Sequence, residues 1–520
     1  MSEAGFPPTR DRQRRAFPYL SVFLIFFVAI SVWALHQPTR DVTIEQSVVG
    51  GAPVTVFRVD QVAPRPAVVI AHGFAGSQQL MHPMAVTLAR NGYVAITFDF
   101  AGHGRNPTPM AGGVKDMGKS TQHLLSEIGE LVSFARTMKG ANGAVALAGH
   151  SMAAELVVQY AMQNPGIDAT IALSLFGKAV TAESPRNLLV ITGAWEPAVL
   201  KDAGFRIATL AADGQAQERQ TYGNFASGTA RRFVLAEGTE HIGVIYSRDA
   251  LNETARWLND VFNRTSDGFI ESRGKWIGLL ILSLIVLARP MLSWLPNVSE
   301  RKARAESTSW RQFAIPALLP MFLTPLFLWQ APTDFLPILL GDYLAVHFTL
   351  YGLITFAALK YLQRNRNNSP AYKFMSWRAF IVAAAGVAAY QIIVLGLPID
   401  RYVTSFAPSG WRWFIIPAMF ASTAIYFLAD AAVLRTFPDM RGAYAVTKLC
   451  FAFSLAIAVA LNPSKLFFLA IIVPVICLFF IVYGLINRWA LKSTGEPYAA
   501  ALGNAFALAW AIAVTFPIVN

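Results

Sequence analysis

The stretch "VALAGHSMAAELV", residues 145–157, places a serine between two kinds of secondary structure. Its first part is a short apolar run of the kind that forms a buried strand, and its last part has the apolar spacing of a helix. Ser151 stands where the strand ends, and the small residues Gly149 and Ala153 lie two positions to either side of it. This order predicts a tight strand-to-helix turn that holds the serine hydroxyl out at the end of the strand.

The overall composition is that of a membrane protein. Apolar residues make up 54% of the 520 residues and charged residues 14%, well below the share found in soluble domains. The net charge is +12, but most of the excess Lys and Arg lies in short loops beside apolar segments, which indicates membrane orientation and not a nucleic-acid-binding face. Cys450 and Cys477 are the only cysteines and cannot build a disulfide framework or a thiolate metal site. We therefore expect contact with membrane lipid, and no nucleic acid, metal or cofactor.

Changes in hydropathy and charge divide the chain into four parts. Residues 1–16 form a basic N-terminus, and residues 17–35 are an apolar run long enough to cross a hydrocarbon core of roughly 30 Å. A cleavable signal peptide is the alternative, but the run is long and lacks a good small-residue cleavage site, so we expect an uncleaved signal anchor. Residues 40–270 have the texture of a soluble domain, and residues 276–519 are apolar again.

Six apolar runs in residues 40–270 alternate with helical stretches and Gly-rich turns. In chain order they read PAVVIAH, YVAITFDF, AVALAGH, ATIALSL, NLLVITG and RRFVLAEG. Such alternation predicts a doubly wound α/β domain with a mostly parallel sheet. Only residues 176–186 separate the fourth run from the fifth, which is too short for a helical cap over the site. Residues 105–118 are either a mobile loop at the pocket mouth or an ordinary surface loop.

The apolar C-terminal half predicts an all-α, polytopic membrane domain. Eight spans are expected near 276–295, 312–331, 336–359, 379–397, 412–434, 445–461, 466–487 and 498–519, which makes nine with the signal anchor. The loops on the side of the N-terminus, together with that terminus, carry 18 Lys and Arg, whereas the short loops on the other side carry three. The positive-inside rule therefore puts the N-terminus in the cytoplasm and residues 40–270 outside. The short loops and Ala-rich spans favour a bacterial inner membrane, with the domain in the periplasm or at the cell surface.

Partners for Ser151 follow other strand-like runs. Glu196 comes after NLLVITG and His241 after RRFVLAEG, so an acid and then a histidine follow the serine in chain order. The carboxyl ends of parallel strands meet at one edge of the sheet, where a site can assemble. Backbone N–H groups of Phe74 and Met152 would provide two donors for a developing oxyanion. The turns around these groups contain His72, Gly73, Gly149, His150 and Ala153.

Residues 40–262 resemble the α/β-hydrolase fold superfamily, close to its lipase, esterase and serine-peptidase-like members. The resemblance rests on the HG turn at 72–73, the DFAGHG turn at 99–104 and the GHS turn at 149–151, which occur in the family's order. The family implies Ser151 as nucleophile in an acyl-enzyme mechanism.

The same resemblance implies His241 as general base and then acid, and Glu196 as the carboxylate that orients the imidazole. The chain departs from the commonest pattern in having Glu in place of Asp as the third member. Glu183 or Asp202 would take this position if the loop after the fifth run follows another course.

The membrane half contains two candidate site residues of its own. Asp342 and His347 lie in the predicted span 336–359, towards its outer end. Ionisable side chains inside spans are energetically costly and often functional. Their spacing does not put them on one helical face, which argues against a paired role. Asp342 and His347 are therefore candidates for a site in the membrane half, with substrate contact near Asp342 as one alternative, whereas Asp430 is expected to have a structural role.

These features predict a membrane-bound serine hydrolase that cleaves ester or amide bonds, with an acyl-containing small molecule or lipid as substrate. Lipid-linked envelope molecules at the outer face of the membrane fit this arrangement. One alternative is an acyltransferase that uses the same triad. The other is a transporter or lipid-handling protein with a non-catalytic hydrolase-like domain, in which Ser151→Ala would leave function intact. The sequence carries no information on oligomeric state.

Overall fold

The computed structural model describes residues 10–60, 63–113, 116–177, 179–301, 309–364, 372–438 and 440–520. The chain forms two compact units, which we name the helical unit and the sheet unit. The helical unit comprises Met1–Ala29, Ile281–Pro398 and Trp411–Phe516. The sheet unit comprises Ile30–Leu280, Ile399–Gly410 and Pro517–Asn520. Two short segments from the apolar half of the sequence therefore belong to the sheet unit.

The described part of the sheet unit contains a nine-stranded sheet in the order β1-β2-β4-β3-β5-β6-β7-β9-β8. The strands are β1 (Thr43–Val49), β2 (Ala52–Arg58), β3 (Arg65–Ala71), β4 (Val94–Phe98), β5 (Ala141–His150), β6 (Ala169–Leu173), β7 (Leu188–Gly193), β8 (Thr221–Tyr222) and β9 (Arg231–Ala236). The neighbours from β4 to β9 are parallel, whereas β1, β2 and β8 are antiparallel. Strands β4, β6 and β7 are buried along their whole length, which explains their continuous apolar runs. The predicted mostly parallel sheet is confirmed.

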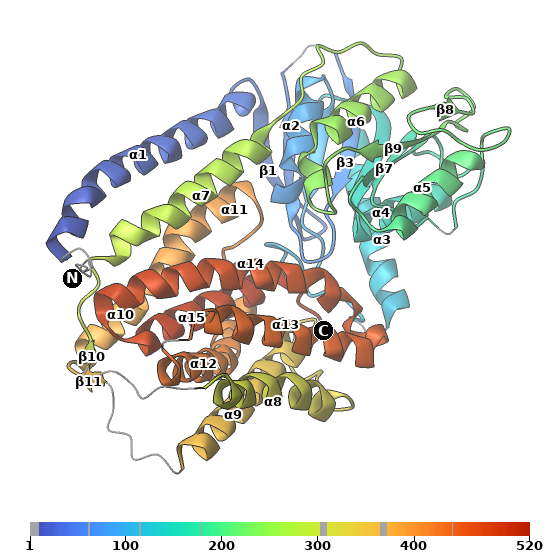
Figure 1. Cartoon of the computed structure of the whole chain (residues 1–520). Coiled ribbons are helices and arrows are strands. Elements are labelled where there is room, and N and C mark those ends of the chain that lie inside the picture. Colours follow the sequence, from blue (N-terminus) through green and yellow to red (C-terminus); the bar gives the residue numbers. More distant parts are fainter. Residues whose placement is uncertain are drawn as a thin grey trace. The chain divides into compact units, whose positions relative to one another are not determined.

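Helices cover both faces of this sheet (Figure 1). On one face, α2 (His82–Arg90) and α6 (Arg248–Val261) close a large core that includes the fully buried Trp257. On the other face lie α3 (Met117–Thr137), α4 (Met152–Gln163) and α5 (Ala198–Thr209). The doubly wound arrangement follows from right-handed crossovers between parallel strands, and it leaves the strand ends open for a site.

The helical unit consists of long apolar helices. Within the described residues, nine helical segments of the chain are long and apolar enough to cross a membrane. Their helices are α1 (Arg10–His36), α7 (Arg273–Leu292), α8 (Trp310–Leu328), α9 (Gly341–Gln363), α10 (Trp377–Ala389) with the π-helical turn η4 (Tyr390–Leu395) and α11 (Gly396–Tyr402), α12 (Arg412–Thr436), α13 (Ala443–Leu461), α14 (Pro463–Thr494) and α15 (Pro497–Thr515). A two-stranded antiparallel ribbon of three-residue strands, β10 (Ser299–Arg301) with β11 (Tyr372–Phe374), accompanies them. The expected all-α apolar half is confirmed, as is the number of candidate spans.

Some helix bounds differ from the predicted spans. Helix α9 begins at Gly341 and not at 336, because Pro337 precedes it and Leu340 adopts a positive φ of 65° that ends the preceding turn. The predicted span 379–397 continues as far as Tyr402. Helix α15 ends at Thr515, so the last residues of the predicted span 498–519 lie outside the helix.

Small residues allow close helix contacts in the helical unit. A Cβ at Gly352 of α9 would lie 2.9 Å from the backbone of Ile425 in α12, and one at Gly503 of α15 would lie 2.6 Å from Val387 in α10. Close approach of this kind stabilises helix pairs where water cannot drive association. Lys448, inside the predicted span 445–461, lies within α13 and is buried.

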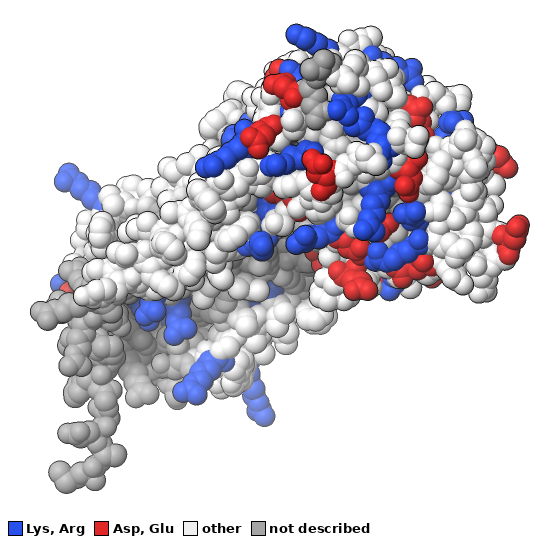
Figure 2. Space-filling view, turned by 90° about the horizontal axis from the view of Figure 1, so that it is seen from above, with Lys and Arg blue, Asp and Glu red and all other residues white. Residues whose placement is uncertain are grey.

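The surface of the protein differs between regions (Figure 2). Basic and acidic side chains are interspersed over the sheet unit, whereas the surface along α1 and α7 is mostly uncharged. Exposed apolar side chains on α1 include Tyr19, Phe23 and Trp33. Such a face is compatible with contact to lipid.

Candidate active site

Ser151 lies in a strained turn between β5 and α4. Its backbone has φ 57° and ψ −119°, a region that non-glycine residues seldom adopt. The Ser151 N–H donates to the carbonyl oxygen of Leu173 at the end of β6, over 2.9 Å. A Cβ at Gly149 would lie only 2.4 Å from the carbonyl oxygen of Ala153, so the turn requires glycine at this position. The geometry is that of a nucleophile elbow.

The structure brings Ser151, His241 and Glu196 together. Ser151 Oγ lies 2.9 Å from His241 Nε2, and His241 Nδ1 lies 2.7 Å from Glu196 Oε2. The three side chains come from the ends of β5, β9 and β7, which meet at the carboxyl edge of the sheet. Glu183 and Asp202 do not take this place, because the carboxylate that contacts His241 belongs to Glu196.

Glu196 is buried and accepts hydrogen bonds on both carboxylate oxygens. Its Oε1 accepts from Ser174 Oγ at 2.7 Å and from the Gly193 N–H at 2.8 Å, while Oε2 faces His241. Burial by itself would raise the pKa of Glu196, but the hydrogen bonds from His241, Gly193 and Ser174 outweigh it and lower the pKa. The carboxylate therefore stays ionised and can fix the orientation of the imidazole.

Ser174 is a site residue that the sequence analysis missed. It follows β6, is 2% exposed and has a positive φ of 62°. Its N–H donates to the Ile191 carbonyl oxygen at 2.8 Å, which fixes the residue between β6 and β7. The sequence signal for Ser174 was its position directly after β6, the strand that neighbours the elbow strand β5.

His150 supports the backbone of His241. Its Nε2 donates to the His241 carbonyl oxygen over 2.7 Å, and the two rings lie 4.9 Å apart between centroids. Burial, and then the neighbouring His241, lowers the pKa of His150 to about 3, so the ring stays neutral. The residue before the nucleophile thus contacts the loop that carries the candidate base.

The turn that begins at Gly73 packs against the elbow. A Cβ at Gly73 would lie 3.1 Å from the His150 carbonyl oxygen and 3.2 Å from the Cβ of Ser151. His72 fixes this turn, because its Nδ1 donates to the Gly73 carbonyl oxygen at 2.8 Å and its Nε2 accepts from the Phe100 N–H at 3.2 Å. Burial lowers the pKa of His72, which keeps it neutral. Phe74 is the next residue of this turn.

Met152, the second expected donor, is the first residue of α4. The Met152 N–H therefore belongs to the first turn of a helix, where N–H groups have no partner within the helix and the dipole favours negative charge. The elbow thus supplies a suitable position for an oxyanion donor directly after Ser151.

A buried carboxylate ties the turns at this edge together. Asp99 is fully buried and accepts from the Gln78 N–H at 2.8 Å through Oδ1 and from the Arg105 N–H at 3.0 Å through Oδ2. A Cβ at Gly104 would collide with this carboxylate, at 2.5 Å. The DFAGHG turn therefore folds around the side chain of its own first residue.

A second buried acid, Glu127 of α3, binds the same loop through hydrogen bonds. Its carboxylate accepts from the Ala101 N–H at 3.0 Å and from Asn106 Nδ2 at 3.3 Å. Burial raises the pKa of Glu127 to about 7. The sequence analysis did not identify this residue, since an acid within an amphipathic helix is usually exposed.

Asp342 and His347 of the helical unit are not brought together. The Asp342 carboxylate accepts from the N–H groups of Phe335 and Tyr343, at 3.0 and 2.8 Å, and so stabilises the start of α9. His347 is fully buried, with Nδ1 3.4 Å from Tyr343 Oη and Nε2 3.1 Å from Ser454 Oγ. Both contacts are structural in character.

Asp430 pairs with Lys448 at 2.5 Å between α12 and α13. The aromatic rings of Tyr426 and Tyr444 each lie 4.9 Å from the Lys448 ammonium group. This buried pair agrees with the structural role expected for Asp430.

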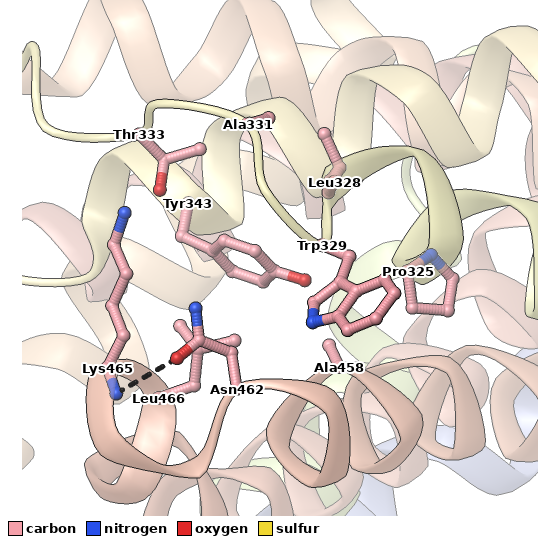
Figure 3. Close-up of a pocket in the computed structure, with 10 residues that line it drawn as sticks. All are labelled: Pro325, Leu328, Trp329, Ala331, Thr333, Tyr343, Ala458, Asn462, Lys465 and Leu466. Atoms are coloured by element: carbon pink, nitrogen blue, oxygen red, sulfur yellow. Dashed lines mark hydrogen bonds between the residues drawn. The ribbon is translucent and has the colours of Figure 1, made fainter.

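A small recess lies among α8, α9, α13 and α14 (Figure 3). Its lining includes Trp329, Thr333, Tyr343, Asn462 and Lys465. Figure 3 shows the hydroxyl groups of Thr333 and Tyr343 turned towards the recess. Neither Asp342 nor His347 is among its lining residues, and the recess belongs to the helical unit, whereas Ser151 belongs to the sheet unit. In the part of the chain that the structure describes, no three His, Cys, Asp or Glu side chains are grouped as metal ligands.

Comparison with known proteins agrees with this architecture. Residues 62–212 match the family model for serine aminopeptidase, S33. Together with the sheet order and the elbow, this match defines the sheet unit as an α/β-hydrolase domain. The helical unit lies outside the matched residues.

The chain is also similar to solved structures of two hydrolases. A CIB-like hydrolase from Thermoplasma acidophilum is 18% identical, with 42% of this chain and 98% of that one covered and a TM-score of 0.32. An epoxide hydrolase from Vigna radiata is 13% identical, with 43% and 99% covered and a TM-score of 0.30. No curated protein matches the chain.

Proposed function

We propose that this chain is a membrane-bound serine hydrolase that cleaves ester or amide bonds through an acyl-enzyme. The observation that carries the proposal is the continuous contact from Ser151 Oγ through the imidazole of His241 to the Glu196 carboxylate, with distances of 2.9 and 2.7 Å. A serine on a strained elbow, a histidine within hydrogen-bond reach and a buried carboxylate behind it are the arrangement that nucleophilic acyl transfer requires.

In this mechanism His241 removes the Ser151 proton as the hydroxyl oxygen attacks the substrate carbonyl. The backbone N–H groups of Phe74 and Met152 stabilise the oxyanion of the tetrahedral intermediate. His241 then gives its proton to the leaving group, and Glu196 stabilises the transient imidazolium. A water molecule, activated by the same histidine, releases the acyl group and regenerates Ser151.

The acyl donor is proposed to be a lipid or a lipid-linked envelope molecule. The nine apolar helices of the described residues would tether the chain to a bilayer, where such substrates are concentrated. The short segment between β6 and β7, residues 174–187, leaves no room for a helical cap, so a large substrate can reach the strand ends. The distribution of Lys and Arg favours an external site at a bacterial inner membrane.

The match to a serine aminopeptidase model makes aminoacyl amides a second substrate class to test. Esters and amides pass through the same acyl-enzyme and differ in the leaving group that His241 must protonate. A panel that contains short-chain and long-chain p-nitrophenyl esters, lysophospholipids and aminoacyl p-nitroanilides separates these classes.

The deciding experiment is labelling of the full chain in intact cells with a fluorophosphonate, with Ser151→Ala as the variant. Labelling of the wild type and its loss in the variant would support an activated serine. Ser133→Ala is a matched control, because Ser133 is exposed on α3 and its Oγ donates to the Gly129 carbonyl oxygen of the same helix. A membrane-impermeant probe tests sidedness in the same cells. Absence of labelling in detergent-solubilised wild type would refute the proposal.

A further inference from the structure

Two segments from the apolar half of the sequence border the candidate active site. Ile399–Gly410 runs from the end of α11 towards α12, and Pro517–Asn520 follows α15. Both belong to the sheet unit. The first segment contacts Ser77 and Arg105, and the second contacts Gly102 within the DFAGHG turn and Met110 after it. We name these two segments the clamp.

The first segment of the clamp holds the residues that follow the candidate oxyanion turn. Ser77, which is fully buried, accepts from the Ser405 N–H at 2.8 Å and contacts Thr404 Oγ1 at 3.0 Å. Two residues later, Gln79 Nε2 donates to the Asp400 carbonyl oxygen at 3.3 Å. Since Ser77 is three residues after Phe74, these bonds restrain the chain directly behind the proposed oxyanion donor.

Asp400 connects this segment to the DFAGHG turn. One oxygen of its carboxylate lies 2.5 Å from Arg105 Nη2, and the other accepts from the N–H groups of Phe406 and Ala407 at 2.8 and 3.0 Å. The side chain of Arg105 is 42% exposed, so the ion pair is screened and would contribute little as an isolated contact. The ion pair instead joins two loops, because the backbone N–H of Arg105 donates to the Asp99 carboxylate while the Arg105 guanidinium contacts Asp400.

The second segment of the clamp holds the other side of the same loop. The Ile518 N–H donates to the Gly102 carbonyl oxygen at 2.8 Å, and the Ile518 carbonyl accepts from the Met110 N–H at 2.8 Å. A Cβ at Gly102 would lie 2.4 Å from the Ile518 carbonyl oxygen, so this approach depends on glycine. The part of residues 105–118 up to Met110 is thus fixed by backbone hydrogen bonds.

We propose that the clamp positions the oxyanion turn, with Asp400 and Arg105 as positioning residues, so that acyl transfer depends on segments supplied by the membrane half of the chain. An oxyanion donor must lie within a few tenths of an ångström of its working place, and a displacement of about 1 Å lowers rates by roughly 100-fold. The inference rests on the proposed function, because it assigns the clamp a role in catalysis by Ser151.

The test compares Asp400→Asn and Arg105→Gln in the full chain, with kcat and KM measured on an ester that the wild type cleaves. Asn keeps an oxygen for the N–H groups of Phe406 and Ala407 but removes the charge that faces Arg105. We expect both variants to lower kcat at least fivefold, with KM within twofold of wild type. The double variant should be no slower than the slower single variant, because both remove one contact. Arg105→Lys should recover at least half of the lost rate.

Asp267→Asn is the matched control, since it makes the same chemical change in an exposed loop of the sheet unit and should leave kcat unchanged. Wild-type kcat in both Asp400→Asn and Arg105→Gln would overturn the inference. Hydrogen exchange of residues 77–79 and 102–110 gives a readout that needs no activity. We expect at least tenfold faster exchange of these residues in Asp400→Asn. Unchanged exchange would overturn the proposed positioning role of the clamp, even if the wild type hydrolyses esters. A wild type without hydrolase activity would instead refute the proposed function.

Discussion

His150 Nε2 donates a hydrogen bond to the backbone carbonyl oxygen of His241, 2.7 Å away. The residue that precedes the nucleophile in the sequence therefore holds the loop of the candidate base. This contact fixes the distance between Ser151 Oγ and His241 Nε2 through the backbone, independently of the bond between these two atoms. We therefore predict that His150 positions the loop of His241. Because the imidazole of His150 is neutral, this role should not depend on pH.

His150→Leu removes the donor with little loss of volume, whereas His150→Gln keeps an N–H that can reach the carbonyl. One lost hydrogen bond of about 1 kcal/mol corresponds to roughly a fivefold loss in rate. We therefore expect kcat to fall about fivefold in His150→Leu and less in His150→Gln. Because the pKa of His150 is about 3, the ratio to wild type should stay constant from pH 5 to pH 9. A ratio that changes with pH would contradict a purely positional role.

Glu196→Gln should lower kcat by about 10³- to 10⁴-fold, because the amide cannot stabilise the imidazolium and can favour the wrong tautomer of His241. Ester turnover in the purified full chain measures this. Glu183→Gln serves as the comparison, since Glu183 was an alternative third member and is not the partner of His241. Loss of activity in Glu183→Gln with retention in Glu196→Gln would reverse the assignment.

Gly149→Ala should destabilise the sheet unit and abolish fluorophosphonate labelling, because the new Cβ would lie 2.4 Å from the Ala153 carbonyl oxygen. Gly278→Ala in α7 is a suitable control, since no described atom lies within 4 Å of its Cβ position. Thermal unfolding in detergent, followed by labelling at a temperature where both variants are folded, separates the two effects. A labelled and fully stable Gly149→Ala protein would show that the elbow can relax.

Glu127 makes stability depend on pH. Its pKa is raised from 4.5 to about 7 in the folded chain, so folding favours its protonated form. The stabilisation is complete below about pH 4.5 and is lost as the pH rises through about 7, by up to about 3 kcal/mol. Denaturant unfolding should show that the free energy of unfolding falls more between pH 5 and pH 8 in the wild type than in Glu127→Gln. Parallel losses in the two proteins would mean that other groups are responsible.

The six parallel strands could be predicted because each is an uninterrupted apolar run bounded by glycine-containing turns. The β1–β2 hairpin was missed, although Gly50-Gly51 between two polar–apolar runs is a hairpin signal, with both glycines at positive φ. Its first strand is largely exposed and lacks the apolar run on which the analysis depended.

The candidate triad could be predicted because chain order and strand ends place Ser151, Glu196 and His241 at one edge. The contacts of Ser174 and Asp99 could not, because they depend on how the neighbouring turns fold, and those of Asp400 could not, because they join segments far apart in the sequence. Asp400 in particular lies almost 300 residues from Arg105 and within what the sequence presents as a membrane domain. Hydropathy reports the lengths of spans, but it carries no information on which protein surface their connecting loops cover.

The sheet unit is discontinuous in the sequence, since Ile399–Gly410 and Pro517–Asn520 join it from beyond most of the apolar helices. During synthesis the ribosome completes the Ser151, Glu196 and His241 constellation long before it has made the two segments that contact Ser77 and Gly102. A nascent chain would thus carry an unfinished site until the later helices had been inserted. Biogenesis itself would then delay the onset of hydrolysis until the protein is in its membrane.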